Sequence, residues 1–270
     1  MKRPLWQIDA FSGRRFGGNP AAVVVLDAWL SDETLLAIAA ENNLSETAYL
    51  VRESDHYGIR WFTPREEVPL CGHATLASAW VVLHRLAPTW TRVVFHSRSG
   101  ELPVERHGDR LVLDFPLGEL EPAPESPALV AALGHAPREL YAGWHWLALY
   151  DSEEEVRALR PNMAGIVATG IHGIVVTARG KDCDFVSRFF APAAGVPEDP
   201  VTGSAHTRLV PFWAERLGKT TFFARQVSAR GGELWCELRK EEKRVLIAGE
   251  AVLYLEGTIE VGPQVQTQGG

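Results

Sequence analysis

Two glycines that follow similar stretches of chain are the clearest candidates for chemistry in this sequence. Gly72 begins the run Gly-His-Ala-Thr, and Gly203 begins Gly-Ser-Ala-His. If each glycine starts a helix, free backbone N–H groups and a partial positive charge are presented there, and a ligand can approach closely. Two such helix starts facing each other would form an anion-binding slot, whose natural occupant is a substrate carboxylate. The alternative is ordinary capping, by Thr75 for the first helix and by Thr202 or Ser204 for the second.

Titratable side chains accompany both glycines. Cys71 and His73 flank the first one, and Asp199 lies four residues before the second. A helix N-terminus lowers the pKa of a histidine and favours its neutral, hydrogen-bonding form. By position alone, Asp199 is equally a turn residue. Glu46, at the entry to a predicted strand, is equally a solvated carboxylate.

The two glycines end two copies of one pattern. Residues 60–72 and 188–203 both contain Arg, an aromatic residue, Phe, a small residue and Pro, followed by Val-Pro and the glycine. The copies are separated by nearly half of the 270-residue chain. This spacing predicts an internal duplication: an α+β fold of two similar lobes, each a rolled, mostly antiparallel sheet around a central helix. We place the lobes at 1–118 and 119–270, with room for the last strands of one lobe to cross over to the other.

The local patterns supply the elements that such lobes need. Helices are predicted over 31–42, over the nearly all-apolar stretch 73–86, and from Ser204 to Leu217 with Pro211 inside. The Pro- and Glu-rich segment 116–128 is predicted to lie near the lobe boundary. Strands are predicted at 5–11, 21–26, 47–52, 59–62, 91–97, 101–106, 110–115, 139–150, 172–178, 183–190, 220–227, 233–238, 243–248 and 252–260.

Composition excludes several classes of function. The net charge of −7 argues against nucleic-acid binding, which needs a basic surface. No apolar run is long enough to span a bilayer, and the N-terminus lacks an apolar signal core. Three cysteines give neither a disulfide framework nor a C-x-x-C metal site, and nine histidines show no metal-ligand spacing. We therefore expect a cytoplasmic protein without membrane, nucleic-acid or metal partners. His145 and His172 are interpreted as ordinary strand residues.

Several motifs together resemble the phenazine-biosynthesis PhzF-like family, which has the diaminopimelate-epimerase fold. The resemblance covers essentially the whole chain, and the combination of motifs is specific. The motifs are I-D-A-F at 8–11, G-G-N-P-A-A-V at 17–23, N-N-L-S-E-T-A at 42–48, R-W-F-T-P at 60–64, V-P-L-C-G-H-A-T-L-A at 68–77 and E-D-P-V-T-G-S-A-H at 198–206.

The resemblance implies roles for the candidate residues. Glu46 matches the family's main acid/base, and His73 and Asp199 match its partners in proton transfer. The reaction implied is an isomerisation that moves a proton and a double bond on a small carboxylate-bearing substrate, without cofactor or metal. The resemblance also implies a homodimer. The residues that it places around the substrate are Asn19, Gly72, Gly203 and Ser204.

Two alternatives stay open at this stage. Related enzymes of the same fold are racemases or epimerases that place a cysteine before the glycine at both helix starts. Here the first position is Cys71, but the second is Thr202, whose hydroxyl is far too weak an acid to replace a thiol. The other alternative is a non-catalytic small-molecule binding protein that keeps the cleft, against which the joint presence of Glu46, His73 and Asp199 argues.

Overall fold

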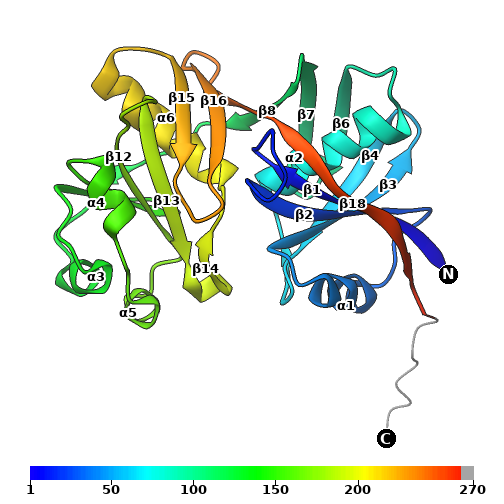
Figure 1. Ribbon diagram of the computed structural model, residues 1–270, viewed down its shortest axis with the longest axis horizontal. Helices are drawn as coiled ribbons and strands as arrows, with labels where there is room; N and C mark the ends of the chain where they lie inside the picture. The colour runs from blue at the N-terminus through cyan, green and yellow to red at the C-terminus, as the bar shows by residue number, and fades with distance from the viewer. Residues whose placement is uncertain (263–270) are drawn as a thin grey trace, which may run out of the picture.

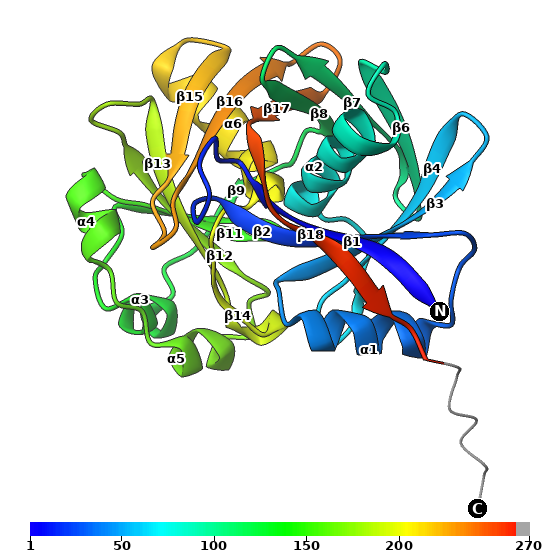
Figure 2. The same ribbon diagram turned by 45° about the vertical axis from the view of Figure 1, so that its right-hand side comes forward.

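Two lobes lie side by side in the computed structural model, which describes residues 1–262 (Figure 1). A central helix runs through each lobe: α2 (Gly72–Val81) in one and α6 (Gly203–Leu217) in the other. Curved sheets surround both helices, as Figure 2 shows from a second side. The predicted α+β architecture of two rolled lobes is confirmed.

The first lobe is formed mainly by the first half of the chain. α2 continues into the π-helical segment η1, so the predicted helix 73–86 is present but changes its winding near the end. The other elements are β1 (Lys2–Ala10), β2 (Asn19–Leu26), α1 (Asp32–Asn42), β3 (Glu46–Glu53), β4 (His56–Phe62), β5 (Glu67–Val68), η1 (Val82–Leu86), β6 (Arg92–Ser97), β7 (Gly100–His107) and β8 (Arg110–Pro116).

The second lobe also contains three short helices, α3 to α5, which lie outside the helices predicted from the sequence. The elements are β9 (Glu121–Pro122), α3 (Pro127–Leu133), β10 (Glu139–Ala142), β11 (Trp146–Leu149), α4 (Glu153–Ala158), α5 (Met163–Ala168), β12 (Ile174–Arg179), β13 (Phe185–Ala191), η2 (Pro192–Ala194), β14 (Val196–Asp199), β15 (Thr221–Gln226), β16 (Gly232–Arg239), β17 (Arg244–Gly249) and β18 (Ala251–Glu260).

Strand pairing repeats from one lobe to the other. In the first lobe β2 pairs parallel with β3, β3 antiparallel with β4, and β4 parallel with β6. In the second lobe β11, β12, β13 and β15 make the same three kinds of pair in the same order. An identical pairing order in both halves is the structural counterpart of the sequence repeat.

The two lobes share strands. The last strand, β18, returns to the first lobe and pairs antiparallel with β1 along nearly its whole length, as the red and blue ribbons in Figure 1 show. β8 pairs with β17 across the lobes. These pairings connect the lobes through backbone hydrogen bonds. The exact division at residues 118 and 119 stays a prediction.

The central helix α2 is buried because its sequence has no polar face. Apart from His73, its residues are small or apolar, and Trp80 is the one that is not fully buried. Ser78 and Thr75 would be costly in such surroundings, but each hydroxyl donates a hydrogen bond to the carbonyl four residues earlier. Burial on all sides thus packs the helix into the lobe and positions its N-terminus.

One predicted strand is wrong in detail. The stretch 139–150 forms two strands, β10 and β11, separated by a bend that contains Gly143, Trp144 and His145. A Cβ on Gly143 would lie 2.9 Å from the carbonyl oxygen of Glu119, so the neighbouring segment presses on the chain at this bend. Within residues 1–262, no helix combines the length and apolarity needed to cross a membrane.

Candidate active site

The N-termini of α2 and α6 meet at the lobe interface. A Cβ built on Gly72 would lie 3.4 Å from the Cα of Gly203, and one on Gly203 would lie 3.6 Å from the Cα of Gly72. The approach places the partial positive charges of two helix termini side by side. Such an arrangement is unfavourable unless an anion lies between them, which is the geometry predicted from the two glycines.

Neither of these helices is capped by a side chain. Cys71 and Thr202 are the N-cap residues of α2 and α6, and neither side chain makes the capping hydrogen bond. By contrast, α1, α3, α4 and α5 are each capped by a Ser or Asn side chain. The capping alternative considered from the sequence is therefore wrong for both helices, and their first N–H groups have no side-chain cap to displace.

Asn19 connects the candidate residues of the two lobes. Its Nδ2 donates to Asp199 Oδ1 at 2.8 Å and to the Val201 carbonyl at 2.9 Å, and it lies 3.1 Å from His73 Nδ1. All of these groups are buried. The side chain at the start of β2 thus holds α2 and the β14–α6 segment in a fixed relation.

The turn before Asn19 explains the Gly-Gly-Asn-Pro sequence. Gly18 has φ +64°, and a Cβ there would lie 2.1 Å from the Ala10 carbonyl oxygen, so only glycine fits. Arg230 in the second lobe holds this turn, donating to the carbonyls of Gly17 and Gly18 and to the buried Asp9 carboxylate. The position of Asn19 therefore depends on both lobes.

Glu46 and His73 face each other at the first helix terminus. His73 Nε2 and Glu46 Oε2 lie 3.2 Å apart. Asn19 Nδ2 lies beside His73 Nδ1, but its two N–H groups also face Asp199 and Val201, and within residues 1–262 neither His73 Nε2 nor Glu46 Oε2 makes a hydrogen bond. Burial lowers the pKa of His73 to about 3, so the neutral form predominates. The lowered pKa follows the prediction, although its cause is burial.

The two carboxylates of the site have raised pKa values. Burial, followed by the charge of Asp199, raises the pKa of Glu46 to about 8, against a smaller lowering by a hydrogen bond from Cys71. Burial also raises the pKa of Asp199, to about 6, although hydrogen bonds from Thr202 and Asn19 oppose this. Near neutral pH the pair therefore holds at least one exchangeable proton.

Cys71 is buried beside these groups, and its Sγ lies 3.5 Å from His73 Nδ1. Burial and the charge of Glu46 raise the pKa of this thiol well above its ordinary value, so it stays protonated. The ligand atoms of Glu46, Cys71 and His73 lie within 4.8 Å of one another, a spacing that a metal ion would accept. A metal would have to displace the proton of this thiol. The expectation of no metal stays a prediction.

A cavity of about 460 Å³ opens from the helix termini. Glu46, Gly72, His73, Asp199, Gly203 and Ser204 line it, and Asn19 holds two of them from behind. The structure thus brings all seven predicted site residues together, while their roles stay predictions.

The sequence interpretation missed the outer wall of this cavity. His145 and His172, interpreted as ordinary strand residues, both line it, with ring centroids 5.5 Å apart and nearly parallel. Each lies in a bend just before a strand, β11 or β12. Trp144 and Arg208 line the same wall. The one sequence signal that could have indicated this wall is the run Trp144-His145-Trp146.

Equivalent ion pairs support the two helix termini. Arg60 Nε donates to Glu67 at 2.7 Å, and Arg188 Nε donates to Glu198 at the same distance, each with a second bond from the same guanidinium. Both arginines begin the repeated segment, and both glutamates flank its Val-Pro. Bidentate pairs of this kind fix the loop that leads to each helix.

Comparisons with known proteins agree with this architecture. The family described as phenazine biosynthesis-like protein matches residues 8–257. A protein of Pseudomonas aeruginosa named an uncharacterized isomerase is 51% identical, with 97% of this chain and all of the relative covered. A crystal structure titled as a phenazine biosynthesis protein of the PhzF family, from Enterococcus faecalis, is 44% identical with a TM-score of 0.93, covering 96% of this chain and all of the other.

A more distant likeness concerns the fold alone. A hydroxyproline epimerase from Agrobacterium vitis superposes with a TM-score of 0.61 over 96% of this chain and 92% of its own, at 11% identity. Its similarity supports the shared two-lobed epimerase-like architecture. From the match over residues 8–257 and the near-complete coverage of close relatives, the chain belongs to the phenazine biosynthesis-like, or PhzF, family.

Proposed function

We propose that this protein is a cofactor-independent isomerase that moves a proton, together with a double bond, on a small carboxylate-bearing substrate. The observation that carries the proposal is the meeting of two uncapped helix N-termini beside Glu46, whose pKa is raised to about 8. The named isomerases among the relatives support the same reaction class.

In the proposed mechanism, the first N–H groups of α2 and α6 and the Ser204 hydroxyl hold the substrate carboxylate. Ionised Glu46 removes a proton from a carbon near this carboxylate, and the C–H electron pair forms a new double bond. The original double bond opens toward another carbon, which takes a proton from Glu46 or Asp199. Fixed N–H donors stabilise the charge that develops during the transfer.

The neutral imidazole of His73 serves this chemistry by orientation. We assign the ring proton to Nε2, which lies 3.2 Å from Glu46 Oε2 and makes no hydrogen bond to it in this structure, while Asn19 contacts the ring at the other nitrogen. Such a donor favours one position of the carboxylate without adding a charge to the cleft. Proton transfer within the cluster then requires no large movement of the side chains.

Epimerisation by two thiols is less well supported. Cys71 is buried and its thiol stays protonated, because burial raises its pKa. At the opposite helix the equivalent residue is Thr202, whose hydroxyl donates a hydrogen bond to Asp199. Two-base inversion needs one thiolate and one thiol on opposite faces of the substrate, and this chain has a thiol on one side only.

Proton exchange in heavy water tests the proposal on a panel of candidate acids. Small cyclic and unsaturated carboxylic acids are incubated with the protein in D2O, and loss of C–H signals is followed by proton NMR. We expect exchange with at least one acid, and a decrease of roughly 100-fold or more for Glu46→Gln. Undiminished exchange by this variant would reject Glu46 as the proton carrier, and binding without exchange would favour a binding protein.

A further inference from the structure

Arg208 is a half-buried arginine without an ionic partner. Among residues 1–262 it is the one Lys or Arg that lines the cavity, and none of the ion pairs found there includes it. Its Nε is buried without a hydrogen-bond partner, and its Nη1 reaches only the Thr207 hydroxyl, at 3.5 Å. Leaving a guanidinium partly desolvated and unpaired costs free energy. A ligand anion would recover that cost.

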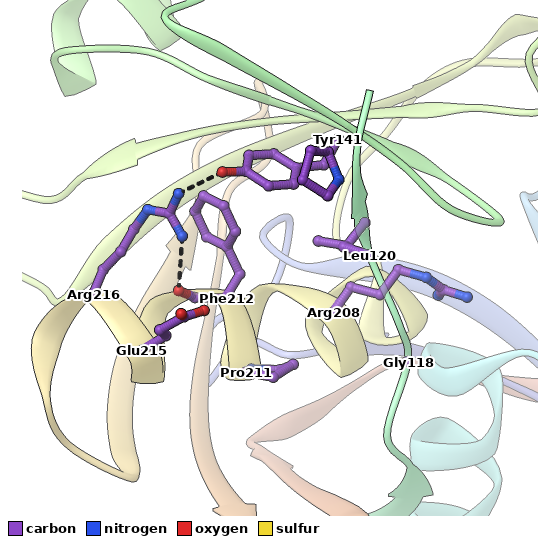
Figure 3. A pocket seen from close by; sticks show the side chains of 9 residues that line it. Gly118, Leu120, Tyr141, Arg208, Pro211, Phe212, Glu215 and Arg216 are labelled. Carbon is purple, nitrogen blue, oxygen red and sulfur yellow. Dashed lines mark hydrogen bonds between the residues drawn. The ribbon is translucent and has the colours of Figure 1, made fainter. Parts of the chain in front are cut away.

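Arg216, two turns further along α6, is an arginine of the same helix whose guanidinium has an ionic partner and hydrogen bonds. It donates to Glu139 at 2.6 Å and to the Tyr141 hydroxyl at 2.8 Å, and its guanidinium lies 3.7 Å from the centre of the Phe212 ring. Figure 3 shows Arg208 extending away from this group, past the segment that carries Gly118 and Leu120. Arg208 therefore differs from its neighbour in its lack of ionic partners, although both arginines line the pocket drawn in Figure 3.

The segment that carries Gly118 helps to position the Arg208 side chain. Pro211 has no N–H, which leaves the Thr207 carbonyl without its helical partner, and the Gly118 N–H donates to that carbonyl at 3.2 Å. Gly118 is thereby pressed against the arginine: a Cβ there would lie 2.6 Å from Arg208 Cγ and 3.2 Å from Cζ. The segment between the lobes thus covers one side of the Arg208 side chain.

The geometry points to a second anion-binding subsite, formed by Arg208 with His145 and His172, that selects substrates carrying a second acidic group. Arg208 follows Ser204 by four residues, so it lies one helical turn, roughly 5–6 Å, from the proposed carboxylate slot on the same face of α6. The inference rests on the proposed function, because the first acidic group is the carboxylate held between the helix termini.

The surroundings favour an anion at this place. His145 is buried, its Nδ1 has no hydrogen-bond partner within residues 1–262, and its ring packs on His172. Burial and the charge of Arg208 lower the pKa of His145 to about 3, so the ring stays neutral and offers a hydrogen bond. Glu67, which also lines the cavity, is already paired with Arg60 and Arg98. Because its carboxylate is already paired with two arginines, Glu67 is not expected to form an ion pair with Arg208 as well.

A pair of probes that differ by one charge tests this inference. Isophthalate and its monomethyl ester are titrated into the full chain by calorimetry. We expect the wild-type protein to bind the diacid at least tenfold more tightly than the ester, and Arg208→Met to lose this preference while binding the ester as before. Arg208→Lys, which keeps a point charge, should retain part of the preference.

Matched variants separate the possible outcomes. Arg216→Met lies on the same helix outside the cavity and should keep the wild-type preference. Ser204→Ala should weaken the diacid and the ester by the same factor. Equal binding of both probes by the wild-type protein, or equal weakening of both by Arg208→Met, overturns the second subsite. Failure of Glu46→Gln to slow proton exchange refutes the proposed function instead, and leaves the diacid preference as a separate result.

Discussion

Replacing Glu46 by Gln should change how the free energy of unfolding depends on pH. In the unfolded chain this carboxyl titrates near 4.5, whereas burial and Asp199 raise its pKa to about 8 in the folded protein. Between these values the folded state binds more protons than the unfolded state. The free energy of unfolding of the wild-type protein therefore falls as pH rises through this range. Gln has nearly the same shape and cannot ionise, so this decrease in the free energy of unfolding should be absent in the variant.

The size of the effect follows from the same values. One pH unit of difference in pKa corresponds to ~1.4 kcal/mol, so the interval from 4.5 to about 8 sets an upper limit of about 5 kcal/mol. Asp199 shares the cost of the second charge, because its own pKa is raised to about 6. Relative to the wild-type protein, the free energy of unfolding of Glu46→Gln should increase by roughly 3 kcal/mol between pH 5 and pH 9 and change little above pH 9.

Urea unfolding followed by tryptophan fluorescence measures this directly, since the chain has nine tryptophans. Unfolding curves of both proteins at pH 5, 7 and 9 give the difference at each pH. Glu66→Gln is the control, because it also removes a carboxylate from the lining of this cavity, at an exposed residue. If the difference for Glu46→Gln is the same at all three pH values, the carboxyl is not desolvated and the proposed proton carrier loses its physical basis.

Three further substitutions test other parts of the site. Gly203→Ala should leave stability unchanged or raised by up to ~1 kcal/mol, since the new Cβ meets Phe11 at an ordinary 3.5 Å, yet calorimetry should show at least tenfold weaker carboxylate binding because the slot is filled. Cys71→Ala should keep proton exchange in D2O within about threefold, because a thiol that stays protonated cannot act as the base; abolished exchange would restore thiol chemistry. Asn19→Ala should lower the free energy of unfolding in urea by about 2–4 kcal/mol, because buried acceptors including Asp199 lose their donor; a loss below ~1 kcal/mol would contradict this linking role.

The inner part of the site could be predicted from sequence because its signals are local. The glycine that starts each helix, the apolar run after it and the repeated Arg-to-Gly segment all lie within short stretches of chain. Their repetition also predicted that the two helix starts face each other. Glu46 and Asp199 needed the family resemblance, since a carboxylate at the entry to a strand or in a turn is usually solvated.

The outer wall could not be predicted because it depends on tertiary contacts. His145 lies in a bend where Glu119, from the segment between the lobes, presses on Gly143, and no periodicity records that contact. The role of Pro211 is similar. Its sequence predicts a kink, but only the fold shows that the freed carbonyl binds Gly118. Residues far apart in sequence determine which side chains face the cavity.

Comparison of the two repeats also explains why the candidate site is asymmetric. Pairing of Tyr49 with Arg60 and of Val176 with Arg188 aligns β3 with β12, which places Gly173 at the position equivalent to Glu46. The first lobe therefore supplies a carboxylate that the second lacks.

Conversely, Asp199 lies in residues 196–203, which are longer than the equivalent stretch 68–72 of the first lobe. A symmetric frame would favour two equivalent bases on opposite faces of a substrate, as inversion requires. Here Glu46 and Asp199 occupy non-equivalent positions, and their charges interact strongly enough for Asp199 to raise the pKa of Glu46. Repulsion between two buried carboxylates favours a state in which one of them keeps its proton. That arrangement suits transfer of one hydrogen between two carbons better than inversion at a single carbon.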